Sequence, residues 1–139
     1  MTRYTELLKQ YASLANLPAE DFLANQELVI ADTAIGLASE GDPDFGDLVV
    51  FSTLGRPAAD VEREKLMQLM LEANALWAGT GGCTLGLQAG TGAVLLCARL
   101  SLVATTASSL SAALQAFTDV ALLWKEVVQG KVHPQLIVN

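Results

Sequence analysis

The chain has 139 residues, 52% of them hydrophobic and 17% charged, with a mean hydropathy of +0.40 and a formal net charge of −7. This length suits one ordinary domain and is too short for two full cores. The negative charge disfavours nucleic acid as a partner, because phosphates attract basic surfaces. The apolar surplus requires a cover, which can be a membrane, a second copy of the chain or a bound protein.

A membrane is the least suitable of these covers. A spanning helix needs about 20 consecutive apolar residues, and the best run, residues 93–104, is shorter and contains Arg99. The N-terminal segment MTRYTELLKQYASL carries charges and lacks the continuous apolar stretch of a signal peptide. We therefore expect a cytoplasmic protein that does not insert into membranes.

The predicted elements begin with a helix over residues 2–15. Apolar residues recur there at helical spacing, Thr2 can cap the first turn, and Pro18 closes the region. Three strand-like runs follow. The stretch from residue 20 to residue 47, which includes the first two runs and the start of the third, contains eight carboxylates and no Lys or Arg. These runs cover residues 27–31, 33–39 and 47–54, and the carboxylates are Glu20, Asp21, Glu27, Asp32, Glu40, Asp42, Asp44 and Asp47. Such acidity keeps an apolar chain soluble, and the alternative role is to steer a basic partner.

A second helix is predicted over residues 58–77, with Pro57 favouring its first turn. Its second half, LMQLMLEANALW, is apolar around most of its circumference, so it is expected to be buried on two sides. In a domain this small, one side packs on the sheet and the other on a second copy. We therefore predict a homodimer, and its predicted contacts are Leu66, Leu69, Met70, Ala73 and Trp77.

Two further strands, over residues 83–87 and 93–100, are predicted to form a hairpin around a Gly-rich turn. Pairing Leu87 with Ala93 would place Cys83 opposite Cys97, as two reduced thiols. A last helix spans residues 106–128. The result is a single α+β domain over residues 1–130, ordered α-β-β-β-α-β-β-α with a twisted, mostly antiparallel sheet, followed by a tail over 131–139.

No catalytic, cofactor or metal site is predicted. The only histidine, His133, falls in the tail, and metal ligands are not clustered. The GTGG run at residues 79–82 follows a helix and precedes a strand, the reverse of a phosphate-binding loop. This missing chemistry favours a binding protein over an enzyme.

One segment resembles a known family. MLEANALWAGTGGCTLGLQ, with GAVLLCARLSL downstream, resembles the signature of the Tir-chaperone-like (CesT) family, the class I type III secretion chaperones. The resemblance extends over residues 2–128. The chain departs from the family pattern at Asn25-Gln26, where an Asp-Gly turn is usual, and at Ser101, where Pro is usual.

The resemblance implies a cytoplasmic homodimer of a Gram-negative bacterium that needs neither ATP nor metal. Such a chaperone binds the N-terminal segment of a secreted effector in extended form and keeps it ready for the secretion apparatus. Effector-binding residues are predicted on the first helix and the first three strands; the alternative for each is a place in the ordinary core. They are Tyr4, Leu7, Leu8, Tyr11, Val29, Ile35, Leu37, Val49 and Phe51.

Two other functions stay open at this point. One is a dimeric regulatory domain of the same fold that is not dedicated to secretion. The other is a small ligand-binding protein or enzyme whose site the sequence does not reveal.

Overall fold

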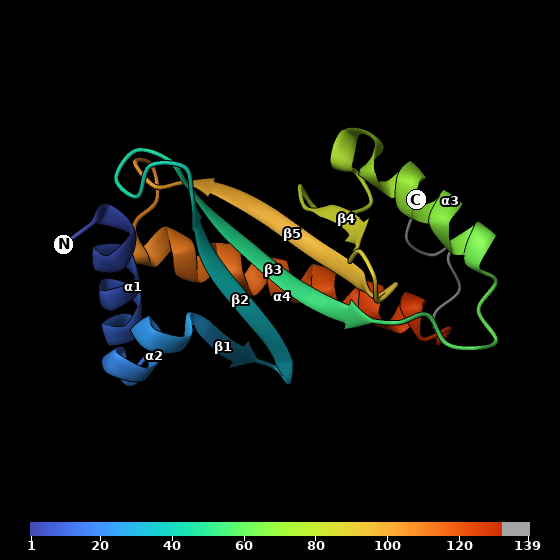
Figure 1. Ribbon diagram of the computed structural model, residues 1–139, viewed down its shortest axis with the longest axis horizontal. Helices are drawn as coiled ribbons and strands as arrows, with labels where there is room; N and C mark the ends of the chain where they lie inside the picture. Colours follow the sequence, from blue (N-terminus) through green and yellow to red (C-terminus); the bar gives the residue numbers. More distant parts are fainter. Residues whose placement is uncertain (132–139) are drawn as a thin grey trace.

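The computed structural model describes residues 1–131, so His133 and most of the predicted tail lie outside the described residues. The elements follow one another as a single α+β unit (Figure 1). They are α1 (Arg3–Leu14), α2 (Ala19–Asn25), β1 (Glu27–Ile30), β2 (Thr33–Glu40), β3 (Asp47–Gly55), α3 (Arg63–Asn74), the 3₁₀ turn η1 (Ala75–Trp77), β4 (Thr84–Leu87), β5 (Val94–Ser101) and α4 (Ala107–Val128).

The strands form one five-stranded sheet in the order β1-β2-β3-β5-β4, and every neighbouring pair is antiparallel. A two-residue turn joins β1 to β2, where Ala31 and Asp32 have φ values of 49° and 61°. Two left-handed residues are typical of the tight hairpin turns that follow the natural twist of strands. The predicted α+β class and antiparallel sheet are confirmed.

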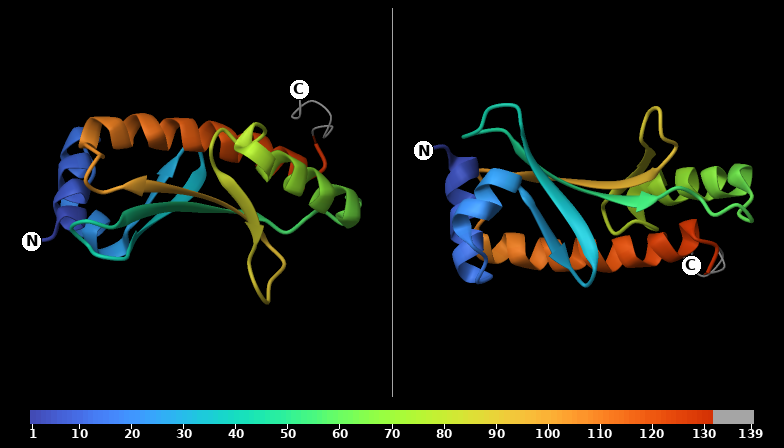
Figure 2. Two further views of the ribbon diagram at one scale, coloured as in Figure 1. Left: turned by 90° about the horizontal axis from the view of Figure 1, so that it is seen from above. Right: turned by 60° about the horizontal axis from the view of Figure 1, so that its bottom comes forward.

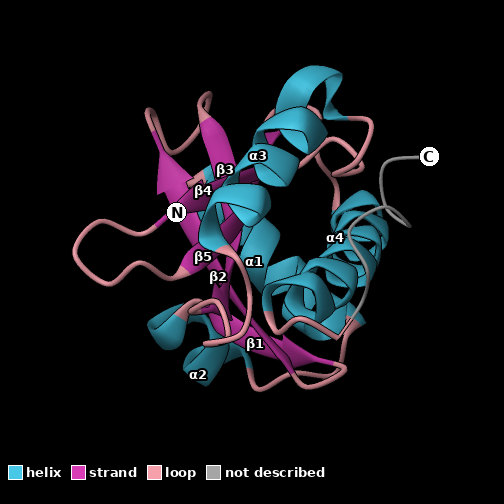
Figure 3. Cartoon of the chain, turned by 90° about the vertical axis from the view of Figure 1, so that its right-hand side faces the viewer, coloured by secondary structure: helices cyan, strands magenta, loops and turns pink. Residues whose placement is uncertain are grey.

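Helix α4 covers one face of the sheet along its length (Figure 2). Thr106 caps it, because the Thr106 side chain accepts from Ser109 N–H while Ser109 Oγ accepts from Thr106 N–H. The buried stripe of α4 includes Leu110, Leu114 and Trp124. Seen from the side, the sheet and α4 form two layers (Figure 3). The hydrophobic core lies between them.

Helix α1 agrees with the sequence prediction, and Thr2 caps it through Thr5 N–H at 3.1 Å. The sequence does not predict helix α2, because Pro18 indicates only the end of α1. Pro18 instead stands at the N-cap of α2. Phe22 of this short helix is buried, and its ring lies 5.9 Å from the ring of Tyr11.

Helix α3 is shorter than predicted at both ends. Residues 57–62 form a loop that is tied to the end of α4 by the hydrogen bond from Ala58 N–H to Val128 O. At the other end the helix breaks at Asn74, and Leu76 and Trp77 adopt left-handed φ values of 61° and 54°. Two successive left-handed residues without glycine are uncommon and mark local strain.

The β4–β5 register differs from the prediction by one residue. Leu87 pairs with Val94 rather than Ala93, so Cys97 lies opposite Thr84 and not Cys83. The hairpin loop is closed by Gln88 N–H donating to Ala93 O, which makes those two residues the last pair of the ladder. Among the described residues, no helix combines the length and apolar content that crossing a membrane requires.

Candidate protein-binding surface

The face of the sheet opposite α4 is open, since no described helix lies over it (Figure 2). Small residues of β2 and the aromatic Phe51 of β3 form its floor. Phe51 pairs with Gly36, and a Cβ at position 36 would lie 2.3 Å from Cζ of the Phe51 ring. Glycine therefore lets the ring lie flat across β2. Phe51 keeps 38% of its surface exposed, which makes it available to a partner.

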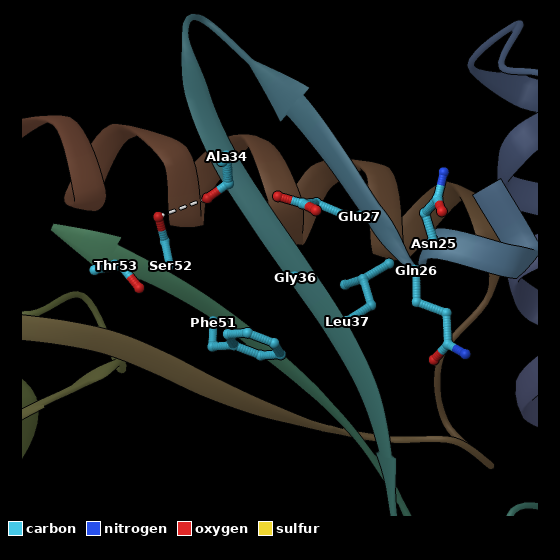
Figure 4. A pocket seen from close by; sticks show the side chains of 9 residues that line it. All are labelled: Asn25, Gln26, Glu27, Ala34, Gly36, Leu37, Phe51, Ser52 and Thr53. Carbon is cyan, nitrogen blue, oxygen red and sulfur yellow. Dashed lines mark hydrogen bonds between the residues drawn. The ribbon is translucent and has the colours of Figure 1, made fainter. Parts of the chain in front are cut away.

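A hollow of about 270 Å³ lies on this face, and we call it the floor hollow (Figure 4). Backbone and side chains of β1, β2 and β3 surround it. Its lining residues are Asn25, Gln26, Glu27, Ala34, Gly36, Leu37, Phe51, Ser52 and Thr53. The hollow is shallow and mixed in polarity, which suits side chains of an extended peptide better than an enclosed small molecule.

The free edge of β1 borders the floor hollow. Leu37 N–H donates to Gln26 O at 2.9 Å, which makes Gln26–Leu37 a hydrogen-bonded pair. Such pairs alternate along an antiparallel ladder, so Glu27 and Val29 point their backbone N–H and C=O groups away from β2. The edge thus offers two sets of backbone groups to an added strand.

A second hollow, which we call the edge hollow, lies between β1 and α2. Its volume is about 140 Å³. It has apolar walls with two carboxylates and an amide at its rim. The residues that line it are Leu17, Pro18, Asp21, Phe22, Asn25, Glu27, Leu28 and Val29. A strand laid along β1 would place alternate side chains in the two hollows, because side chains alternate between the faces of a strand.

The opposite edge of the sheet, at β4, is blocked by Asn74. Its Nδ2 donates to Leu85 O and its Oδ1 accepts from Leu85 N–H, both at 2.8 Å. One side chain thus occupies backbone groups that another strand would need. This role of Asn74 is not among those predicted from the sequence. Its signal was an amide at the end of an otherwise apolar helical run.

The structure separates the predicted effector-binding residues into two groups. Six are buried in the chain's own core, with exposures of 0% to 6%. They are Tyr4, Leu7, Leu8, Tyr11, Ile35 and Leu37. The other three lie on the open face or edge, where Val29 is 66% exposed, Phe51 is 38% exposed and Val49 is half-buried. Only these three have side-chain surface left for a partner.

The two tyrosines of α1 are held in their neutral form. Burial raises the pKa of Tyr4 to about 12, and its hydroxyl donates to Gln26 Oε1 at 2.6 Å. Burial also raises the pKa of Tyr11. The Tyr4 contact fixes α1 to Gln26, which directly precedes β1, so α1 helps to hold the β1 edge in place.

The predicted dimer residues also fall into two groups. Leu66, Leu69, Met70 and Ala73 are at most 7% exposed and pack within the core cluster. Trp77 is 54% exposed, and its neighbours Leu71 and Leu76 are 71% and 88% exposed. We call Leu71, Leu76 and Trp77 the α3 patch.

A third hollow of about 410 Å³ continues the open face toward the α3 patch. Its lining combines residues of β3, β4 and β5 with Trp77. They are Val49, Trp77, Gly82, Thr84, Cys97, Ala98 and Arg99. The open face is therefore a continuous strip that runs from the β1 edge to the α3 patch.

Reactive chemistry is scarce on this strip. Cys83 and Cys97 are free, and burial raises the pKa of both thiols, which disfavours the nucleophilic thiolate. Within residues 1–131, no group of three or more His, Cys, Asp or Glu side chains is placed to hold a metal ion. What the strip offers is apolar surface and unpaired backbone groups.

A family model described as the Tir chaperone protein (CesT) family matches residues 6–125. The chain belongs to this family. The resemblance found in the sequence is thereby confirmed, and so is the predicted class, a chaperone family rather than a known enzyme family. No curated protein matches the chain significantly.

Solved structures share the CesT-family fold of this chain. The match to a chain of the HopA1–SchA chaperone–effector complex has a TM-score of 0.69 and 16% identity, covering 89% of this chain and 94% of that one. The match to a chain of the ExsC–ExsE complex has a TM-score of 0.72 and 19% identity, covering 93% of this chain and 98% of that one. A third match is to the Yersinia pestis type III secretion chaperone SycH in complex with a stable fragment of YscM2. Its TM-score is 0.64 at 19% identity, and it covers 86% of this chain and 98% of that one.

Proposed function

We propose that this protein is a type III secretion chaperone that binds a segment of a secreted effector in extended form. The observation that carries this proposal is the open apolar face of the sheet beside the unpaired edge of β1. A CesT-family fold with this surface has a place for a strand and for its alternate side chains. All three similar structures are described as complexes, the third with a stable fragment of YscM2.

Binding at the β1 edge supplies backbone hydrogen bonds that do not depend on the client's sequence. The floor hollow and the edge hollow then select side chains. An unfolded client loses conformational entropy when it is ordered, so a long contact of about 1,000–3,000 Å² is required. The strip from β1 to the α3 patch provides a continuous surface for such a contact.

The cellular role follows from this mode of binding. A bound segment stays extended and unaggregated in the cytoplasm until the secretion apparatus takes the effector. The chaperone acts by binding alone, without catalysis and without a cofactor. Val29, Val49 and Phe51 are the predicted residues that we assign to the client surface.

We also propose that the α3 patch pairs with a second copy. Leu76 has a strained left-handed backbone and an exposed side chain. The strain costs free energy, and no contact would offset that cost if the side chain stayed in water. Of the predicted dimer residues, Trp77 keeps this role. Leu66, Leu69, Met70 and Ala73 support it from inside the core.

Co-expression with secreted proteins of the source bacterium tests the proposal. We expect one effector to copurify through an N-terminal segment that becomes protease-resistant in the complex. Deletion of the chaperone gene should reduce secretion of that effector and leave its transcription unchanged. A copurified protein bound through a folded domain, with normal secretion in the deletion strain, would contradict the proposal.

A further inference from the structure

The open edge of the sheet is acidic. No Lys or Arg occurs between Lys9 and Arg56, a stretch that includes α2, β1, β2 and β3. Two of its carboxylates border the surface assigned to the client. Asp21 lines the edge hollow from α2, and Glu27 lies on β1 and lines both the edge hollow and the floor hollow.

These two carboxylates are not neutralised by the chain. Among residues 1–131, the ion pairs join Lys65 to Glu62 and Arg99 to both Glu40 and Asp47. Arg99 thus balances acidic residues at the far ends of β2 and β3, away from the β1 edge. Asp21 and Glu27 are exposed and take part in none of these pairs.

The side chain of Glu27 is placed to meet a client strand. Glu27 pairs with Gly36, whose partner on the other side is Phe51, so the three residues form one cross-strand row. Figure 4 shows the Glu27 side chain on β1, beside β2, where it faces the floor hollow. A residue of an added strand directly opposite Glu27 would extend this row outward from the sheet.

We propose that the client segment at the β1 edge carries a Lys or Arg opposite Glu27 and an apolar residue opposite Val29. This inference rests on the proposed function, because it assumes strand addition at that edge. Glu27 and Val29 are two residues apart and share the open face, so their partners in the client are also two residues apart. The residue between these two points toward the edge hollow.

The edge hollow defines that middle residue. Leu17, Phe22 and Leu28 give it apolar walls, and its volume of about 140 Å³ suits one apolar side chain. The client motif is therefore cation–apolar–apolar, read in either chain direction. A cation opposite a carboxylate stabilises a cross-strand pair, and an acidic residue there would be repelled by both Glu27 and Asp21.

Peptide selection on the purified protein tests this motif. The probe is a library of random 12-residue peptides displayed on a carrier protein. It is selected in parallel on the wild type, on Glu27→Lys and on Val29→Pro. The backbone N–H of Val29 points to the free edge, so proline at that position leaves the sheet's own hydrogen bonds intact and obstructs an added strand. Circular dichroism confirms that each variant is folded.

We expect the wild-type pool to be enriched in Lys or Arg two positions from an apolar residue. The Glu27→Lys pool should replace that cation with Asp or Glu, and Val29→Pro should bind the wild-type pool poorly. For one selected peptide, replacing its cation by Gln should weaken binding about two- to five-fold at low salt, as for an exposed ion pair. The effect should shrink as salt is added.

Two results would overturn the inference, and they differ in what else they overturn. If peptides bind the wild type and lose binding to Val29→Pro, but show no cation preference that Glu27→Lys reverses, the charge motif is wrong and strand addition stands. If Val29→Pro binds the same peptides as well as the wild type, the β1 edge is not the client site. The edge-binding part of the proposed function then fails together with the motif.

Discussion

A single side chain, Asn74, decides which edge of the sheet stays open. Its amide makes two hydrogen bonds to Leu85 that a neighbouring strand would otherwise make. The β1 edge has no comparable side chain among the described residues. This difference between the two edges directs an added strand to β1.

Replacing Asn74 by Ala should destabilise the fold and uncover the β4 edge. The partly buried N–H and C=O of Leu85 would lose their partners, which costs about 1–3 kcal/mol in the free energy of unfolding. Urea denaturation measures this cost. Gln68→Ala, an exposed substitution on the same helix, is the matched control and should change stability by less than about 0.5 kcal/mol. Equal stability of the two variants would contradict the role of Asn74.

Tyr4 gives the fold a dependence on alkaline pH. Its pKa rises from 10.0 in the unfolded chain to about 12 in the folded protein, so folding favours the neutral phenol. This contribution to stability is complete below pH 10 and is lost as the pH rises from 10 through 12. Tyr4→Phe should remove this part of the pH dependence.

Ultraviolet titration measures the effect directly, because the chain contains only two tyrosines. In Tyr11→Phe the absorbance near 295 nm reports Tyr4 alone, and it should change only well above pH 10. A titration of folded Tyr11→Phe centred at pH 10 would mean that Tyr4 is not desolvated.

Gly36 sets the position of the Phe51 ring on the client surface. A valine at position 36 would displace the ring, since a Cβ there meets Phe51 Cζ at 2.3 Å. Because the ring is partly exposed and free to move, we expect a change in stability below about 1 kcal/mol. Client affinity should fall about ten-fold, which isothermal titration calorimetry measures. Ala38→Val, on the same strand and face but outside the floor hollow, is the control for added volume alone.

At the residue scale, sequence periodicity identifies the apolar positions. It does not show whether the chain's own core or a partner buries each of them. Tyr4, Leu8 and Ile35 were predicted to bind a client, and the structure buries all three. Val29 and Phe51 have the same kind of apolar side chain and lie on the open side. The difference depends on where α1 and α4 pack, and helical or strand spacing in one sequence does not contain that information.

At the scale of elements, the sequence predicted α1, α4 and all five strands to within one residue at each end. The elements it missed or misplaced are those decided by tertiary contacts. Helix α2 has seven residues and depends on the packing of Phe22 against Tyr11. The loop before α3 is tied to α4 by the hydrogen bond between Ala58 and Val128, which are far apart in the chain.

The one-residue error in the β4–β5 register has a similar origin. The Gly-rich turn allows more than one loop length, and the bond from Gln88 N–H to Ala93 O continues the observed pairing into that turn. This register places Cys97 on the open face opposite Thr84, while Cys83 is buried. A one-residue shift moves every side chain of a strand to the other face, so the shift changes which cysteine a client can contact.

At the scale of the whole molecule, apolar side chains stay exposed at several places among the described residues, and two of these regions carry the proposed binding roles. One is the client surface at β1 to β3, and the other is the α3 patch. Leu71, Leu76 and Trp77 lie within one seven-residue stretch and are each more than half exposed, so the core does not cover them. We propose that a second copy covers this patch and that a client segment covers the open sheet face.

A charge placed in the α3 patch should separate the copies. Leu76 is 88% exposed, so Leu76→Asp removes no contact within the chain and should leave its thermal stability as a folded monomer intact. Light scattering at micromolar concentration should give twice 14.6 kDa for the wild type and 14.6 kDa for the variant. Val103→Asp, exposed at the other end of the sheet, is the control and should remain a dimer. A monomeric wild type would contradict this assignment.

The most direct test of the central claim is amide hydrogen exchange at the β1 edge, measured by NMR with and without a bound effector segment. We predict that the amides of Glu27 and Val29 become strongly protected in the complex, while the amide of Leu87 on β4 does not. Val29→Pro should abolish binding of the same segment without unfolding the sheet. Unchanged exchange at Glu27 and Val29 in a saturated complex would show that the client does not add a strand at this edge.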